Sequence, residues 1–192
     1  NGKEDIEWIG WDRQNGKILV ISKYALEHCD DFAAEELGTS ENWENSTLRK
    51  WLNESFINEA FSQEEQNKIV LSNVVNADTI GTLDRSEEKQ KDGGNDTQDK
   101  LFLLSIDEAE KYFELDEERQ VKATEYLKAR GIYVYESGNC LWFLRSNSLT
   151  GYFPPAFVNR NGYIEDDGYL SFEFMVSNAT FAIRPAMWIS IE

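Results

Sequence analysis

The chain has 192 residues, with 19 lysines and arginines against 36 aspartates and glutamates, so its formal net charge is −17. That charge disfavours binding to nucleic acid or to an anionic membrane surface, because both reward cationic faces. The 6 Trp, 8 Tyr and 11 Phe favour a packed core over a disordered chain, and the length predicts one domain over residues 1–192.

The first predicted element is a β-hairpin. Residues 6–11 and 18–22 have a strand-like composition. Between them, Asn15-Gly16 is a strong signal for a tight turn.

Short helices are expected after the hairpin. Ser62 followed by Glu65 matches a capping box, which opens a helix that runs to Lys68. Residues 69–75 then predict a strand. An earlier helix is expected within residues 41–56, where apolar residues recur at helical spacing after a cap at Asn45 or Ser46: Leu48, Trp51, Leu52 and Phe56.

The middle of the chain changes its composition twice. Residues 76–99 are polar and rich in charge, which predicts a mobile loop inside one domain. Residues 101–104 (LFLL) predict a short buried strand. The capping-box pair Ser105 and Glu108 then opens a helix through about Phe113.

The last third of the chain is predicted to be rich in strands. A helix is expected first, over residues 117–130, and it ends at Gly131. The order of hairpin, helices and then strands favours an α+β fold over a doubly wound sheet. The later strands are expected at 141–145, 152–158, 163–165, 169–175 and 180–190, with tight turns at Asn161-Gly162 and Asp167-Gly168.

Two arginines lie inside apolar runs near the end of the chain, Arg145 in residues 141–146 and Arg184 in residues 181–189. An arginine is rarely buried unless its guanidinium is paired, because removing its water is costly. We therefore expect both to be structural anchors that meet a carboxylate, carbonyl groups or a ligand. Arg145 is also a candidate ligand contact.

Further ligand-binding candidates gather in the strand-rich end. Tyr152, Tyr163 and Tyr169 alternate with Gly, Pro and Asn, and aromatic faces with a few polar groups commonly hold sugars and peptides. The same alternation also suits strands with one face in the core. Asp166 and Asp167 are candidate ligands of a calcium ion, because clustered carboxylates suit a hard cation. No other cofactor is expected.

No catalytic residue is predicted. The two cysteines, Cys29 and Cys140, leave open one disulfide or two unpaired buried thiols. His28 and its neighbour Cys29 do not form a nucleophile and base, because adjacent side chains diverge. No segment approaches the roughly 18 apolar residues of a membrane span. The start at Asn1 suits a removed export signal or anchor, and equally a cloning boundary, so we expect a secreted or cell-surface protein and leave a cytoplasmic one open.

Five motifs follow one another along nearly the whole chain: WENSTLRKWLNESF (43–56), FSQEEQNKI (61–69), NDTQDKLFLLSIDEA (95–109), WFLRS (142–146) and IRPAMWI (183–189). Together they resemble an uncharacterised bacterial domain family, common in Gram-positive gut species, that is described only as a domain of unknown function. The Arg-Ser strand followed by an Arg-Pro-Ala strand is also similar to the C-type-lectin-like fold, which includes the formylglycine-generating enzymes. The chain departs from the family at Phe143, where members have a second tryptophan, and at Asn147-Ser148, where they have Pro-Gly.

The resemblance implies helices packed around a small, twisted antiparallel sheet. The place of Asp99 in the third motif also implies that it is a candidate partner of one of the two arginines. The active-site cysteine pair of the formylglycine-generating enzymes does not carry over, because Cys29 and Cys140 cannot be matched to it residue by residue. We therefore expect a non-catalytic binding module that recognises a glycan or a protein at the bacterial cell surface through residues 147–179. The alternative is a carbohydrate-active or oxidative enzyme of the formylglycine-generating type.

Overall fold

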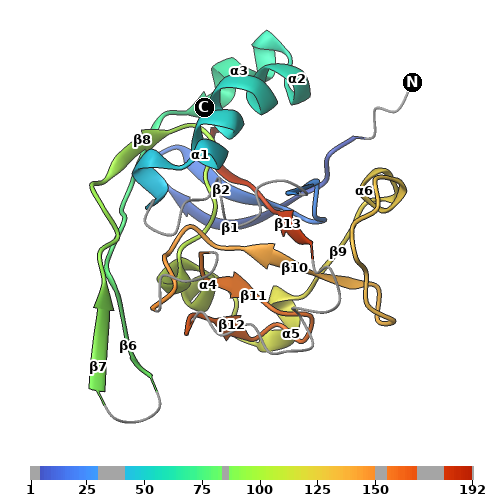
Figure 1. Cartoon of the computed structure of the whole chain (residues 1–192). Coiled ribbons are helices and arrows are strands. Elements are labelled where there is room, and N and C mark those ends of the chain that lie inside the picture. The colour runs from blue at the N-terminus through green and yellow to red at the C-terminus, as the bar shows by residue number, and fades with distance from the viewer. Residues whose placement is uncertain (1–4, 30–41, 84–86, 150–154, 168–179, 192) are drawn as a thin grey trace.

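The computed structural model describes residues 5–29, 42–83, 87–149, 155–167 and 180–191 (Figure 1). It confirms an α+β architecture in which short helices accompany several small sheets. In its described part, no helix has the length and apolar character to cross a membrane.

The first sheet contains the predicted hairpin. Strands β1 (Trp8–Gln14) and β2 (Lys17–Ser22) pair antiparallel. Asn15 and Gly16 both have positive φ, 49° and 72°, as a two-residue turn of this hand requires. The strand order is β1-β2-β14-β4, which also includes β14 (Ala186–Ser190) and β4 (Ile69–Val70). Residues from both ends of the chain therefore share one sheet. This supports the prediction of one domain over residues 1–192.

The second sheet is built around strand β10 (Asn139–Phe143), whose five residues are all buried. β10 pairs parallel with β13, so this sheet is mixed, whereas the resemblance implied an antiparallel sheet. A parallel pair needs a long crossover, which the residues between the two strands supply. The strand order is β12-β11-β10-β13-β3, with β9 also on β10; their bounds are β12 Ile164–Glu165, β11 Phe157–Val158, β13 Phe181–Ile183, β3 Glu27–Cys29 and β9 Val121–Lys122.

The first helices follow the predicted pattern. Ser46 caps the run, because its hydroxyl accepts a hydrogen bond from the backbone N–H of Arg49 at 3.0 Å. The capping boxes at Ser62 and Ser105 both form. The elements are η1 (Trp43–Asn45), α1 (Thr47–Trp51), the π-type turn η2 (Leu52–Phe56), α2 (Ile57–Ala60), α3 (Gln63–Lys68) and α4 (Ile106–Tyr112).

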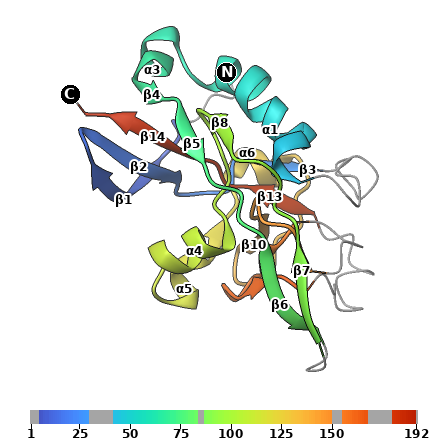
Figure 2. The same cartoon turned by 90° about the vertical axis from the view of Figure 1, so that its left-hand side faces the viewer.

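The polar segment 76–99 is not a plain loop, so that prediction was wrong. Strands β6 (Thr79–Leu83) and β7 (Glu87–Lys91) form a two-stranded ribbon that projects from the body of the molecule (Figures 1 and 2). β8 (Thr97–Asp99) pairs with β5 (Ser72–Val74). Exposed strands that pair only with each other need few apolar side chains, so composition alone does not reveal them.

The helix expected over 117–130 is interrupted. It divides into α5 (Asp116–Arg119) and α6 (Glu125–Ala129), and β9 lies between them. Val121 is buried and pairs with Cys140 in β10, so tertiary pairing outweighs the local helical pattern. Gly131 follows α6 with a φ of +95°, as expected for a helix-ending glycine.

Several predicted strands are shorter than expected. Residues 180–190 form two strands, β13 and β14, with Arg184-Pro185 between them. Within 101–104 all four side chains are buried, but only Phe102 forms a bridge, to Ala186. The strand expected at 169–175 lies outside the described residues.

Candidate functional site

Arg145 is an internal anchor. Its side chain is buried, and its guanidinium donates to the carbonyl oxygens of Leu103 (2.7 Å) and Val75 (2.8 Å) and to Asn76 Oδ1 (3.3 Å). It also forms an ion pair with Glu108, the N3 residue of the α4 capping box. These contacts favour the predicted structural role of Arg145 over the predicted ligand contact, because they turn the donors towards the interior.

Arg184 is buried without a carboxylate partner among the described residues. Its Nε donates to the Ser22 carbonyl oxygen at 2.9 Å, and Nη1 has no hydrogen-bond partner there. The guanidinium carbon lies 5.2 Å from the ring centre of Phe113 and 5.0 Å from that of Trp142. Burial lowers the pKa of Arg184 to about 10. Two aromatic faces and one carbonyl therefore stabilise this cation in the core.

Asp99 is the partner of neither arginine, so that prediction was wrong. It is almost fully buried and accepts from Arg49 Nε (2.7 Å), Trp43 Nε1 (3.0 Å) and Thr97 Oγ1 (2.6 Å). The sequence signal for this pair lies in the first motif, where Arg49 follows the helix cap Ser46 by three residues.

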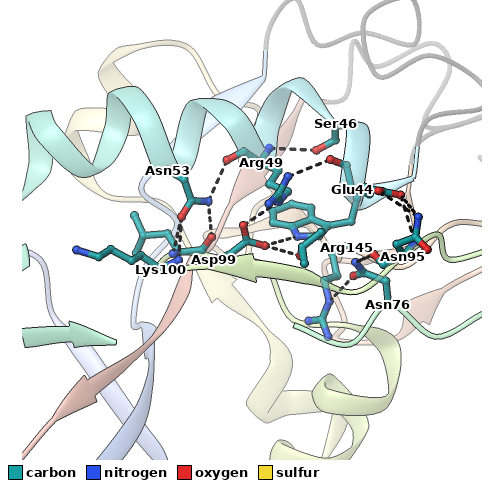
Figure 3. A network of polar contacts seen from close by, with 12 residues as sticks. Glu44, Ser46, Arg49, Asn53, Asn76, Asn95, Asp99, Lys100 and Arg145 are labelled. Carbon is teal, nitrogen blue, oxygen red and sulfur yellow. Dashed lines mark hydrogen bonds and ion pairs between the residues drawn. The ribbon is translucent and has the colours of Figure 1, made fainter. Parts of the chain in front are cut away.

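Three of the five motifs that carry the family resemblance contribute to one polar network (Figure 3): Asn53 comes from the first, Asp99 from the third and Arg145 from the fourth. Asn53 on η2 accepts from the backbone N–H groups of Lys100 and Leu101 at 2.9 and 3.0 Å, and donates to the Leu101 carbonyl at 2.8 Å. Glu44 accepts from the Asn95 side chain at 3.1 Å. These contacts join the first helical run to strand β8 and to the residues that follow it. We therefore interpret the network as structural.

The predicted ligand surface in the strand-rich end is only partly described. Tyr163 is 53% exposed, next to a turn in which Asn159 Oδ1 accepts from its backbone N–H at 3.2 Å. Tyr152 and Tyr169 lie outside the described residues. Of the four predicted ligand contacts, the structure therefore describes Arg145 and Tyr163 alone, the first buried and the second exposed.

The candidate calcium ligands Asp166 and Asp167 follow β12. Burial raises the pKa of Asp166 and of its neighbour Glu165. In the part of the chain that the structure describes, no group of three or more His, Cys, Asp or Glu side chains could hold a metal ion. Calcium binding at these two residues thus stays a prediction.

Cys140 is a free thiol in the core. Its Sγ lies 3.6 Å from the Val121 carbonyl oxygen, and burial raises the pKa of the thiol to about 12. A thiol with such a pKa is a poor nucleophile near neutral pH, because the thiolate is the reactive form. His28 is buried in β3, where its backbone pairs with Ala182.

A pocket of about 610 Å³ lies between the chain entering β1, the helical run of residues 47–68 and α6. These elements line one side of the molecule in Figure 1. Its volume is in the range of known ligand sites, roughly 300–1,000 Å³. Six of its residues are aromatic: Trp8, Tyr24, Trp51, Phe56, Phe61 and Tyr126.

The π-type turn η2 shapes the aromatic floor. Residues five apart diverge in an α-helix of 3.6 residues per turn, whereas the wider π turn brings them closer to one face. The rings of Trp51 and Phe56 accordingly lie 5.1 Å apart. Phe61 lies 6.3 Å from Phe56 and 6.0 Å from Trp8, so the rings form a continuous surface. π turns occur frequently at functional sites.

The rim of the pocket is acidic. None of the described lining residues is lysine or arginine. Five of them carry a carboxylate: Asp5, Glu7, Glu27, Glu59 and Glu65. Such an arrangement can hold an apolar or flat group against the rings and a positive charge at the rim.

The sequence analysis missed this pocket. Its residues come from four segments, 5–8, 24–27, 51–65 and 124–126, which share no motif. The available signal was the group of aromatic residues on the first helical run, whose helical spacing suits a core face equally well. Trp51 and Trp8 are in fact only half-buried.

Residues 15–191 match the model of a family described as a domain of unknown function, DUF6273. The match agrees with the expected resemblance to an uncharacterised domain family. No curated protein and no solved structure matches the chain.

Proposed function

Because the chain belongs to the DUF6273 family, whose function is unknown, we propose from its own geometry that it is a non-catalytic binding module. The observation that carries the proposal is the pocket of about 610 Å³ with an aromatic floor and an acidic rim. Half-buried rings in a pocket of this size suit recognition of a protein segment or a glycan. The enzymatic alternative receives no support from Cys140, because its thiol is buried with a raised pKa.

Two finer expectations belong to the same proposal. The first is a C-type-lectin-like fold for the strand-rich end, which is supported by the burial of Arg145 and Arg184 where the Arg-Ser and Arg-Pro-Ala segments pass through the core. The second is a location at or outside the bacterial cell surface, tested by fractionating cells that produce the native protein.

The proposal is tested on glycan and peptide arrays with the wild type and the Tyr126→Ala variant. Tyr126 lines the pocket and is 43% exposed, so its removal should weaken binding without unfolding the chain. Tyr133→Ala is the matched control, because Tyr133 is 39% exposed and lies outside the described lining.

The outcomes separate this pocket from the strand-rich end. We expect Tyr126→Ala to reduce binding several-fold and Tyr133→Ala to leave it unchanged. A loss caused instead by Tyr163→Ala would move the site to the surface predicted from the sequence. Absence of binding to every glycan and peptide would contradict the proposed function itself.

A further inference from the structure

Two cations of the chain itself already bind at the edge of this pocket, and both do so in the same way. Lys23 Nζ lies 5.0 Å from the ring centre of Tyr24 and 2.8 Å from Glu7 Oε2. The guanidinium of Arg130 lies 5.7 Å from the ring centre of Tyr126, and its Nη1 is 2.9 Å from Glu27 Oε2. In each case an aromatic face and a carboxylate share one positive charge.

A third set of rings and carboxylates has no such cation among the described residues. Trp8, Trp51 and Phe61 form part of the floor, and no described lysine or arginine stacks on them. Asp5 and Glu59 line the same pocket and form no ion pair within the described part of the chain. Both residues are exposed, so their charges are available at the rim.

Glu65 does not belong to this set. Its carboxylate accepts hydrogen bonds from the backbone N–H and the hydroxyl of Ser62, each at 2.7 Å, in the capping box of α3. These bonds lower the pKa of Glu65, so the carboxylate remains ionised, and its Oε2 is already engaged by Ser62. Asp5 and Glu59 are therefore the rim carboxylates that a ligand can engage.

We infer that the pocket takes a lysine-bearing or arginine-bearing segment of a partner protein, seated with its cationic side chain against the rings and between Asp5 and Glu59. This inference rests on the proposed function and specifies its ligand. Charge complementarity selects the occupant, because Asp5 and Glu59, together with the ionised Glu65, repel an acidic peptide, a phosphate or an anionic lipid. A metal ion would bind the carboxylates but gain little from the aromatic rings. An alkylammonium or guanidinium group contacts both the rings and the carboxylates.

The inference is tested with an acetylated and amidated peptide, Gly-Lys-Gly-Arg-Gly, titrated into the whole chain by calorimetry and by tryptophan fluorescence. The neutral comparison peptide has acetyl-lysine and citrulline at the same positions, which keeps the shape and removes the charge. We expect the basic peptide to bind at least tenfold more tightly than the neutral one, and to change the fluorescence of the tryptophans in the floor.

Variants separate local recognition from the general attraction of an acidic protein. Glu59→Gln should weaken binding of the basic peptide about five- to tenfold, because it removes one charge-assisted contact. Glu54→Gln is the matched control, since Glu54 is also exposed on the same helical run but does not line the pocket. It should change the affinity less than twofold.

Three results would overturn the inference. The first is the absence of any detectable binding of the basic peptide at a concentration of about 1 mM. Equal losses in Glu54→Gln and Glu59→Gln would indicate only long-range attraction. If the neutral peptide or a neutral oligosaccharide binds as tightly and depends on Tyr126, the cationic ligand is wrong while the proposed binding function stands.

Discussion

Replacing Arg145 with methionine should destabilise the protein strongly, whereas the same change at Arg184 should cost little. Both side chains are buried, at 5% and 1% relative exposure, and both were predicted to anchor the fold. Their surroundings differ, however, because Arg145 meets a carboxylate and several oxygens while Arg184 meets one carbonyl and two rings. Methionine keeps a long apolar side chain in each position and removes only the guanidinium.

The magnitudes follow from the groups left behind. Without Arg145, the carbonyls of Leu103 and Val75 and the Asn76 amide oxygen lose a charged donor, and each buried acceptor without a partner costs about 1–3 kcal/mol. Part of the loss is recovered because the Glu108 side chain is 29% exposed and can be hydrated. Breaking one partner of a buried ion pair then costs about 3–5 kcal/mol in total.

At Arg184 the losses and gains nearly balance. Methionine there loses the bond to the Ser22 carbonyl and two cation–π contacts, together about 2–4 kcal/mol. It also removes a buried cation whose Nη1 has no partner among the described residues, which recovers a penalty of several kcal/mol. We expect a net change of about 0–2 kcal/mol.

Urea unfolding monitored by circular dichroism measures both variants, with thermal unfolding as a second readout. For a chain of this size 1 kcal/mol shifts Tm by about 2–4 °C, so Arg145→Met should lower Tm by about 6–20 °C. Arg13→Met is the control, because Arg13 is exposed on β1 and carries the same charge. The reasoning is refuted if Arg184→Met costs as much as Arg145→Met, or if neither variant differs from the control.

Three more changes test the fold around the site. Asp99→Asn should lower the free energy of unfolding by about 2–4 kcal/mol in urea titrations, because Asp99 is 1% exposed and Arg49 loses its partner; an unchanged midpoint would contradict this. Gly162→Ala should destabilise by more than about 2 kcal/mol, since its φ is +91° and a Cβ would lie 1.7 Å from a carbonyl oxygen of α5, whereas Gly131→Ala, with open space around it, should cost only about 1 kcal/mol. Cys140 should resist alkylation at pH 8 in the native state, because its pKa of about 12 leaves little thiolate, and should react after unfolding; peptide mapping by mass spectrometry would reveal native labelling if the thiol is accessible.

The polar network of Figure 3 gives the sequence motifs a structural meaning. Asn53 and Asp99 belong to different motifs, yet both fasten the first helical run to the strand beside it. The pocket residues lie partly outside these motifs.

Elements with a complete local signal were predictable. The Asn15-Gly16 turn and the capping boxes at Ser62 and Ser105 depend on residues within three positions of one another. The burial of Arg145 was also predictable, because its flanking residues are apolar. Its partners were not, since Val75 and Leu103 lie in distant segments that reveal nothing about the guanidinium.

The amino-acid sequence alone determined the α+β class, the hairpin, the helix starts and the burial of two cations, because hydrophobic spacing and capping act over a few residues. Only the tertiary structure decided that β9 interrupts the helical stretch at Val121, that residues 79–91 form a ribbon, and that Trp8, Trp51 and Tyr126 meet in one pocket. Those outcomes depend on which distant segments pair and pack, and that choice is made by the free energy of the whole chain rather than by any local pattern.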